Sequence, residues 1–371
     1  MRDSTTHQEI YINGRFLSQA LTGVQRYAAE LVRAIDDLLV AGEMPPSLSN
    51  TRFTVLAPPD AATDLELKRV TIRKIGSRRG HSWDQIDLAL AARGKPLLSL
   101  ANSGPVLHRR HLVVLHDAQA YRHPEFFSRS YLLVHRTLGR ILSKTARLGT
   151  VSAFSRSELS WALGVPEASI AIIPNSAEHL LRIVPDETIL SRLGLPRGKY
   201  FLALGTLSRN KNFALAVEAS KRLQRPDYPL VVVGGGNKQV FGEDGFPASD
   251  VIVAGRLRDE EIAALYSHAT AFIFPSIYEG FGVPLLEAMV FGCPVIASTA
   301  AAVMETCGDA ASYFDPTDAT ALARLMQERI DGEPPLEVLT VRQNARLARY
   351  SWKRSATKLL DVLQDPSLFR T

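Results

Sequence analysis

Short apolar runs separated by amphipathic segments dominate the hydrophobic pattern of the chain. The runs are rich in β-branched residues and leucine, and several are apolar at every position, as strands buried on both faces of a parallel sheet are. We predict strands at Ile10–Ile12, Phe53–Leu56, Leu112–Leu115, Ile170–Ile173, Tyr200–Leu204, Leu230–Val233, Val251–Val253 and Ala271–Phe274.

Amphipathic segments with helical spacing lie between these runs. We predict helices at Val24–Leu39, at Phe213–Leu223 behind a capping Asn212, and at Ala319–Ile330. Strands that alternate with helices form a parallel sheet with helices packed on its faces. A chain of 371 residues is long enough for two such domains, so the pattern predicts an α/β protein with two sheets.

A connection between the two domains is predicted where the pattern breaks. Pro185, Pro196 and Gly198 interrupt regular structure within a short stretch. We therefore expect a first domain at residues 1–178, a linker at 179–198 and a second domain at 199–351.

The composition is typical of a globular protein, with 46% hydrophobic and 22% charged residues. No apolar run reaches the roughly 20 residues that span a bilayer, and Met1–His7 lacks the apolar stretch of a signal peptide. Cys293 and Cys307 cannot make a disulfide framework. We expect a cytoplasmic protein, with peripheral attachment to the inner face of the cytoplasmic membrane as an open alternative.

Positive charge is concentrated in the first half of the chain. Residues 1–178 hold 22 Lys/Arg against 16 Asp/Glu, whereas the remaining residues hold 21 against 22. The stretch from Phe126 to Ser157 contains no acid at all. This distribution predicts an anionic partner for the first domain.

Two glutamates flank a glycine-rich turn after the predicted strand Ala271–Phe274. Glu279 precedes the turn, and Glu287 lies in a helix that we expect from about Pro284 to Phe291, with proline at its first position. The free backbone N–H groups and the dipole of a helix start attract an anion. If that anion is a phosphate, the carboxylates are free to accept hydrogen bonds from hydroxyl groups on either side of it.

A ligand with hydroxyls on both sides of a phosphate is a nucleotide-sugar. The alternative is that both glutamates only favour the positive helix end and face water.

Cations, glycines and a histidine follow other predicted strands. Arg209 and Lys211 lie on a loop at a strand's carboxyl end, where open α/β sheets bind ligands, and both could neutralise a diphosphate. Gly234–Gly236 would clear space beside a ligand, and His116 ends a buried strand. Solvated cations, a tight turn and a structural histidine are the alternatives.

Together these motifs resemble those of retaining glycosyltransferases of the large family 4 type. Glu279 and Glu287 match the E-x7-E motif of that family, within a stretch that reads E-G-F-G-x-P-x-x-E-A-M. The similar loops are Gly205–Asn212, Thr22–Tyr27, Val113–Asp117, Val151–Arg156 and Ile172–Asn175. Thr206 stands where many members have arginine, and Ser176 where the family usually has glycine.

The resemblance implies the GT-B fold, in which two Rossmann-like domains face a deep cleft. It implies that the first domain binds the acceptor, that the second binds the donor, and that the final segment 352–371 packs back on the first domain. The implied catalytic residues are His116, Arg209, Lys211 and Glu279. The implied donor-binding residues are Gly23, Gly205, Thr206, Gly280, Phe281, Gly282, Val283 and Glu287.

The resemblance also implies a reaction, the transfer of a hexose from a nucleoside-diphosphate sugar to a glycan with retention of configuration. The loops look most like those of polysaccharide-assembly mannosyltransferases, which makes GDP-mannose the first expected donor, with UDP-hexoses and dTDP-rhamnose open. A nucleotide-sugar isomerase on the same fold and a non-catalytic nucleotide-sugar sensor are the competing hypotheses.

Metal ions and nucleic acid are not expected partners. No D-x-D triplet occurs in the sequence, so we expect Arg209 and Lys211, rather than a metal or another cofactor, to hold the diphosphate. No nucleic-acid motif accompanies the basic residues. The basic segment Ser128–Arg147 fits a helix on an anionic leaflet with a lipid-linked acceptor, and it equally fits a sheet-covering helix with a solvated basic face.

Overall fold

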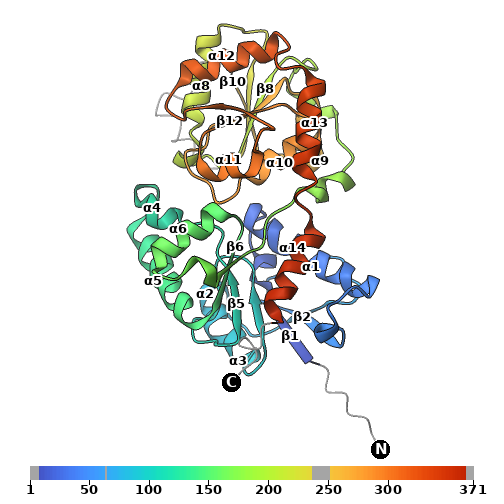
Figure 1. Cartoon of the computed structure of the whole chain (residues 1–371), viewed down its shortest axis with the longest axis vertical. Helices are drawn as coiled ribbons and strands as arrows, with labels where there is room; N and C mark the ends of the chain where they lie inside the picture. Colours follow the sequence, from blue (N-terminus) through green and yellow to red (C-terminus); the bar gives the residue numbers. More distant parts are fainter. Residues whose placement is uncertain (1–7, 63–64, 236–250, 365–371) are drawn as a thin grey trace, which may run out of the picture. The chain divides into compact units, whose positions relative to one another are not determined.

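The computed structural model describes residues 8–62, 65–235 and 251–364. The chain forms two compact units, the first from residues 1–175 and 352–371 and the second from residues 176–351. Each unit holds one parallel sheet covered by helices (Figure 1). The predicted α/β class with two Rossmann-like halves is confirmed.

The first unit is built on a seven-stranded sheet in the order β3-β2-β1-β4-β5-β6-β7. Every pairing is parallel, so the carboxyl ends of the strands share one edge. The strands are β1 (Gln8–Asn13), β2 (Thr51–Ala57), β3 (Thr71–Lys74), β4 (Leu97–Ser99), β5 (His111–Val114), β6 (Arg147–Thr150) and β7 (Ile170–Ile172).

Helices from both ends of the chain cover this sheet. They are α1 (Gly23–Ala41), α2 (Gly80–Ser82), α3 (Ala89–Ala91), α4 (Gln119–Arg122), α5 (Arg129–Thr145), α6 (Ala153–Leu163) and α14 (Trp352–Leu363), with a π-helical turn η3 (Trp83–Leu88) and 3-10 turns η1 (Gly14–Ser18), η2 (Pro46–Leu48), η4 (Pro124–Phe126) and η5 (Glu167–Ser169). The last helix, α14, lies against α1 (Figure 1). The Trp352 ring lies edge-on to Tyr27 at 5.9 Å, and Ser355 Oγ donates to the Pro174 carbonyl at 2.7 Å.

The second unit has a six-stranded parallel sheet in the order β10-β9-β8-β11-β12-β13. Its strands are β8 (Phe201–Leu204), β9 (Leu230–Val233), β10 (Val251–Gly255), β11 (Ala271–Phe274), β12 (Val295–Ser298) and β13 (Ser312–Phe314). Its helices are α7 (Thr188–Arg192), α8 (Phe213–Leu223), α9 (Asp259–His268), α10 (Val283–Val290), α11 (Ala301–Cys307), α12 (Ala319–Ile330) and α13 (Leu336–Leu347), with 3-10 turns η6 (Glu178–Arg182) and η7 (Arg209–Lys211).

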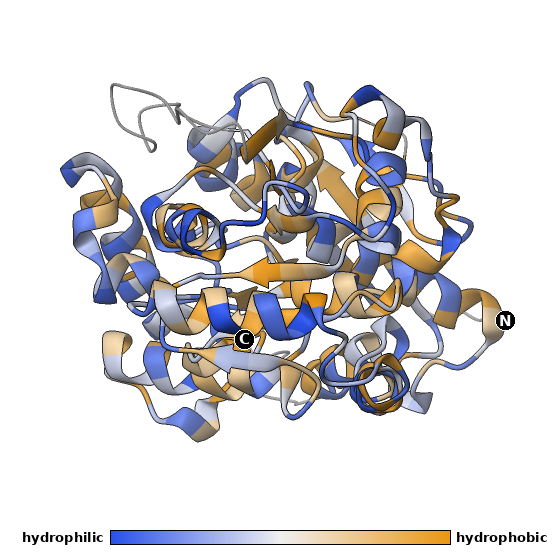
Figure 2. Ribbon diagram, turned by 90° about the horizontal axis from the view of Figure 1, so that it is seen from above, coloured by the Kyte–Doolittle hydropathy of each residue, from blue (hydrophilic) through white to orange (hydrophobic). Residues whose placement is uncertain are grey.

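Alternating strand residues build the core of the second unit. Phe201 and Ala203 of β8, with Ile273 of β11, pack against Phe213 and Leu322 on the helices α8 and α12. Burial of these apolar side chains is the main favourable term in folding. The strands are mostly orange and the helices carry both colours in Figure 2, as expected of buried strands and amphipathic helices.

The segment 179–198, which the sequence predicts as a linker with a short helix-like stretch at Thr188–Leu193, belongs to the second unit. It carries most of η6 and all of α7. The backbone N–H of Asp186 donates to the Glu260 carbonyl at 2.9 Å, and Arg192 pairs with the Glu261 carboxylate at 2.8 Å. These contacts with α9 fix the segment despite its prolines.

Five observed strands, β3, β4, β6, β12 and β13, lie outside the predicted set. β4 and β13 have three residues each, and β6 reads Arg-Leu-Gly-Thr. Except for the apolar β12, runs this short or this polar carry little hydrophobic pattern of their own, and pairing with neighbouring strands decides their structure.

Two helix starts differ in detail from the predictions. Asn212 precedes α8, but its side chain donates to the Pro316 carbonyl at 2.8 Å instead of capping the helix, and its φ of 52° is left-handed. The helix α10 begins at Val283, which places Pro284 at its second position. The first turn still suits proline because its N–H groups have no intrahelical partners.

Candidate functional site

Loops from four neighbouring strands of the second unit contact one another at the carboxyl edge of its sheet. The Ile277 N–H, after β11, donates to the Asn210 carbonyl of the loop after β8 at 2.8 Å. The Gly234 N–H, after β9, donates to the Gly255 carbonyl at the end of β10 at 2.8 Å. The sheet thereby brings together the loops that carry the predicted cations and the predicted glutamate Glu279.

Lys211 and Glu279 form an ion pair in this loop cluster. The Lys211 Nζ lies 2.5 Å from Glu279 Oε1, and the two side chains are only 15% and 13% exposed. The ammonium also lies 5.3 Å from the centre of the Phe274 ring. Partial burial strengthens the attraction because less water screens the charges, so the pair fixes Lys211 beside the glycine-rich turn.

Arg209 lies close in sequence but in a different environment. Its side chain is exposed. Among the residues that the structure describes, Arg209 makes no ion pair. It therefore offers an uncompensated charge on the same loop as Lys211.

A further cation, Arg256, was missed by the sequence reasoning. It follows β10 directly, and a Cβ atom placed on Gly235 would lie 2.2 Å from its Nε. Its position after a predicted strand is the same signal that singled out Arg209. Of the predicted glycine run Gly234–Gly236, the last residue lies outside the described residues.

Two glycines in this cluster are required by close approach. A Cβ atom on Gly234 would lie 1.8 Å from the Gly205 carbonyl oxygen, a distance that no side chain permits. Gly282 has a φ of 91°, and a Cβ atom there would lie 2.6 Å from Leu285 Cδ1. The left-handed backbone of Gly282 turns the chain into α10.

The start of α10 presents the backbone N–H of Val283 close to Glu279 in the sequence. Gly282 ends the turn and Val283 is the first helical residue, so the Val283 N–H has no acceptor within the helix. Pro284 has no N–H, and the Leu285 N–H donates to the Gly282 carbonyl at 3.0 Å. The turn is held by Thr306, whose Oγ donates to the Phe281 carbonyl at 2.6 Å. The Phe281 ring itself packs edge-on against Tyr350 at 5.3 Å and is 5% exposed, so only its backbone faces the turn.

Glu287 lies one turn further along α10 and contacts Tyr266. The Tyr266 hydroxyl lies 3.4 Å from both Glu287 Oε2 and the Pro284 carbonyl, and it donates to these acceptors. Burial raises the pKa of Tyr266 well above its usual value, and the negative charge of Glu287 adds to the effect. The hydroxyl therefore stays protonated and positions the carboxylate.

In the first unit, His116 lies just after β5 at the carboxyl edge. It is buried, and its Nε2 lies 3.0 Å from the Leu100 carbonyl. Burial lowers the pKa of His116 to about 4, so the imidazole is neutral at pH 7. Because a carbonyl can only accept, Nε2 carries the proton and Nδ1 keeps its lone pair.

Gly23 is the first residue of α1 and is exposed. A Cβ atom on Gly23 would meet no heavy atom within 4 Å. The fold itself therefore does not require glycine there. Thr206 is also exposed, and its hydroxyl lies 3.2 Å from Ser208 Oγ.

Two negative findings concern metals and membranes. No group of three or more His, Cys, Asp or Glu side chains suited to a metal ion occurs in residues 8–62, 65–235 and 251–364. Within the same ranges, no helix combines the length and apolarity that crossing a bilayer requires.

Comparisons with known proteins point to one family. Residues 186–354 match the family model described as Glycosyl transferases group 1. The chain is 29% identical over 266 residues to O-antigen chain mannosyltransferase B of Escherichia coli, covering 68% of this chain and 70% of that protein. It is 25% identical over 280 residues to O-antigen chain mannosyltransferase RfbU of Salmonella typhimurium, covering 73% and 74%.

A solved structure supports the same conclusion for the fold. HepE from Anabaena, crystallised in complex with UDP and glucose, matches with a TM-score of 0.71 at 17% identity, over 97% of this chain and 100% of HepE. None of these similarities supports the isomerase alternative. Residues 186–354 therefore resemble group 1 glycosyltransferases, the chain has the GT-B fold, and it is similar to mannosyltransferases.

Proposed function

We propose that this protein is a retaining mannosyltransferase that moves mannose from GDP-mannose to a glycan in polysaccharide assembly. The observation that carries the proposal is the half-buried pair of Lys211 and Glu279, held at 2.5 Å beside the start of α10. The pair supplies a fixed cation and a hydroxyl acceptor, and the N–H of Val283 at the helix start adds a donor. The mannosyltransferase relatives support mannose as the sugar.

The leaving diphosphate is stabilised by positive groups of the second unit. As the glycosidic bond breaks, negative charge grows on the leaving phosphate oxygen. Lys211 is fixed before the reaction by its ion pair with Glu279. Together with the exposed Arg209 and the N–H of Val283, it offsets that charge. These groups take the place of a metal ion in the proposal.

The glutamates recognise the hydroxyl groups on either side of the diphosphate. Glu287, oriented by the Tyr266 hydroxyl, accepts hydrogen bonds from the ribose. Glu279 accepts them from the sugar while it holds Lys211 in place. Because Lys211 then lies between a carboxylate and a phosphate, its positive charge is stabilised by both.

In the first unit, the neutral His116 is the residue that we propose to bind a sugar hydroxyl. Its Nδ1 lone pair accepts a hydrogen bond from a sugar hydroxyl, since Nε2 is occupied by the Leu100 carbonyl. The proposal needs no protein nucleophile. The acceptor hydroxyl attacks the anomeric carbon from the same face that the diphosphate leaves, and the hydroxyl proton passes to the leaving phosphate oxygen. The anomeric configuration is therefore kept.

Association with an anionic leaflet remains part of the proposal for the acceptor. The helix α5 buries Leu142 in a core cluster with Val113 and Leu148, which fits a sheet-covering helix. It also exposes Leu133 and Val134, by 71% and 44%, next to basic residues. Sedimentation with vesicles that contain or lack phosphatidylglycerol tests this part of the proposal, and equal binding to both would contradict it.

A thermal-shift panel of nucleoside diphosphates tests the donor. A ligand at 100 times its Kd stabilises the native state by about 2.7 kcal/mol. At equal concentration, GDP is therefore expected to raise the Tm by more than UDP or dTDP does.

Transfer from GDP-[14C]mannose to a mannan acceptor tests the reaction, and analysis of the product's anomeric configuration tests retention. A larger shift with UDP or dTDP, or an inverted product, would overturn the corresponding part.

A further inference from the structure

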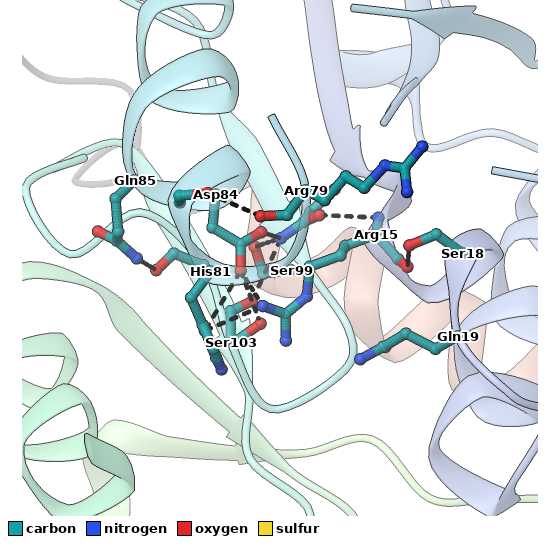
Figure 3. A network of polar contacts seen from close by, with 12 residues as sticks. Arg15, Ser18, Gln19, Arg79, His81, Asp84, Gln85, Ser99 and Ser103 are labelled. Carbon is teal, nitrogen blue, oxygen red and sulfur yellow. Dashed lines mark hydrogen bonds and ion pairs between the residues drawn. The ribbon is translucent and has the colours of Figure 1, made fainter. Parts of the chain in front are cut away.

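A buried polar network lies at the carboxyl edge of the first unit, around the ends of β1 and β4 (Figure 3). Asn13 Nδ2 donates to Asp84 Oδ1 at 3.1 Å and to Ser99 Oγ at 3.2 Å. Ser103 Oγ donates to Asp84 Oδ2 at 3.1 Å. The Asp84 side chain is fully buried, so the network fixes a carboxylate in the interior.

Arg15 joins this network through only one of its terminal nitrogens. Its Nη1 lies 2.6 Å from Asp84 Oδ2 and donates to His81 Nδ1 at 2.9 Å. Within the described part of the chain, the other terminal nitrogen has no hydrogen-bond acceptor, and Figure 3 shows it pointing away from the network. A rigidly held donor is therefore left for a ligand.

His81 offers a second donor beside Arg15. Because its Nδ1 accepts from a guanidinium, the proton of the neutral ring sits on Nε2. Burial and the neighbouring Arg15 charge lower the pKa of His81 to about 4, which keeps the ring neutral at pH 7.

A row of stacked rings, which begins at Phe127 before α5 and continues on that helix, leads to this pair of donors. Phe127, Tyr131 and His135 follow one another at four-residue spacing, and their rings stack at 4.9 Å and 3.9 Å between centroids. The centroid of the His81 ring lies 6.0 Å from that of the His135 ring. Tyr131 is 42% exposed, so the row presents aromatic surface to solvent.

The Arg15 charge next to this row has a partner. The guanidinium is paired with the buried Asp84 carboxylate, and His81 is neutral. Burial, followed by the Arg15 charge, lowers the pKa of His135. A ligand placed here meets donors and aromatic side chains, with the Arg15 charge already paired, which suits a neutral group.

We propose that Tyr131, His135, His81 and Arg15 form a subsite for a neutral hexose of the acceptor glycan. This inference rests on the proposed function, since it assigns part of the acceptor site. Phe127 and His135 cover the two faces of the Tyr131 ring, so the C–H groups of a sugar pack against the exposed edge of the row, and the two donors bind its hydroxyl oxygens. The charge of Asp117, the residue after His116, reaches Tyr131 and raises its pKa, although burial is the larger cause. Tyr131, the middle ring of the row, therefore lies within reach of the Asp117 charge.

Saturation-transfer NMR on the full chain, without donor, tests the subsite directly. The probes are α-1,3-mannobiose and, as an anionic comparison, glucuronic acid. Wild type is expected to transfer saturation to mannobiose. Tyr131→Ala is expected to weaken mannobiose binding at least 5-fold, whereas Tyr131→Phe is expected to keep the affinity within about 2-fold of wild type. Thr137→Ala, at an exposed position of the same helix, is the matched control and should bind as wild type does.

Three results would overturn the proposal: unchanged mannobiose binding in Tyr131→Ala, an equal loss in Thr137→Ala, or tighter binding of glucuronic acid than of mannobiose. In the transfer assay, Tyr131→Ala should raise the acceptor KM at least 5-fold with little change in kcat, and an unchanged acceptor KM would also contradict the subsite. A wild type that binds mannobiose through Tyr131 but shows no transfer from GDP-mannose would overturn the proposed function alone.

Discussion

At the scale of single residues, the Lys211–Glu279 pair has two tasks, because one cation serves both a carboxylate and the proposed diphosphate. The pair lies 2.5 Å apart and is largely shielded from water. Removing one partner leaves the other charge half-buried and uncompensated, which costs stability as well as function.

We predict that Lys211→Ala lowers kcat for mannosyl transfer by about 10²–10³-fold, the usual effect of losing one group that stabilises a developing negative charge. Initial-rate kinetics with GDP-mannose provide the measurement. Lys221→Ala removes an exposed lysine from the last turn of α8 and should leave kcat unchanged. Equal rates in wild type and Lys211→Ala would remove Lys211 from the site.

Tyr266→Phe is predicted to weaken GDP binding about 2- to 10-fold while the fold is retained. The change deletes only the hydroxyl that donates to Glu287 and to the Pro284 carbonyl, and a typical hydrogen bond contributes about 1 kcal/mol. The ring that stacks on Phe291 stays. Isothermal titration with GDP measures the effect, and an unchanged Kd would show that Glu287 needs no such positioning.

Buried neutral histidines make the first unit sensitive to acid. The folded pKa of His116 is about 4, against 6.5 as its ordinary value. The unfolded chain therefore binds more protons between these values, so the contribution to stability is complete above pH 6.5 and is lost as the pH falls towards 4.

The unfolding free energy of wild type should fall between pH 7 and pH 5. We predict that this fall is smaller in His116→Asn, by on the order of 1 kcal/mol. All three tryptophans, Trp83, Trp161 and Trp352, lie in the first unit, so their fluorescence in urea reports on the unit that contains His116. A pH dependence identical to that of wild type would contradict the neutral, buried state of this histidine.

At the scale of elements, the start of α10 depends on one backbone conformation. Gly282→Ala would place a methyl group against Leu285 in a residue with a φ of 91°. The opposite end of the same helix provides a control, because Gly292 has a φ of 66° with nothing near a Cβ atom.

We predict that both alanine variants lose about 1–2 kcal/mol of stability from the left-handed backbone, but that only Gly282→Ala also loses GDP affinity. The alanine methyl group of Gly282→Ala clashes with Leu285 and moves the backbone N–H at the helix start. Gly292 lies after the end of the helix, so its substitution does not. Urea unfolding and titration with GDP separate the two effects. Equal GDP affinities in both variants would place the diphosphate elsewhere.

At the scale of the whole molecule, the chain returns to its first unit after completing the second. The helix α14 inserts Leu359, Leu360 and Leu363 into that unit, so residues at opposite ends of the sequence share one core.

Leu360→Ala is predicted to destabilise the first unit by about 2–5 kcal/mol, the usual cost of a large-to-small change in a core. Tryptophan fluorescence in urea follows the unit, and Lys358→Ala at an exposed position of the same helix is the control. A midpoint equal to that of the control would mean that α14 contributes little to the unit.

The sequence alone determined the fold class, most of the long elements and the family-like motifs. Apolar runs such as Leu230–Val233 and the helix Phe213–Leu223 have the same bounds in the structure, because their patterns are strong and local. Glu279, Lys211 and His116 were found from spacing because each follows a buried strand in a parallel sheet.

Only the tertiary structure decided which of these side chains contact one another and which protonation state they have. The pairing of Lys211 with Glu279 joins loops 68 residues apart, and the network of Asn13, Asp84 and Ser99 joins three segments. The ring row on α5 meets His81 in the same way. Contacts between distant segments, and the burial that sets the charge of His116, depend on how strands pair and helices pack, which no local pattern records.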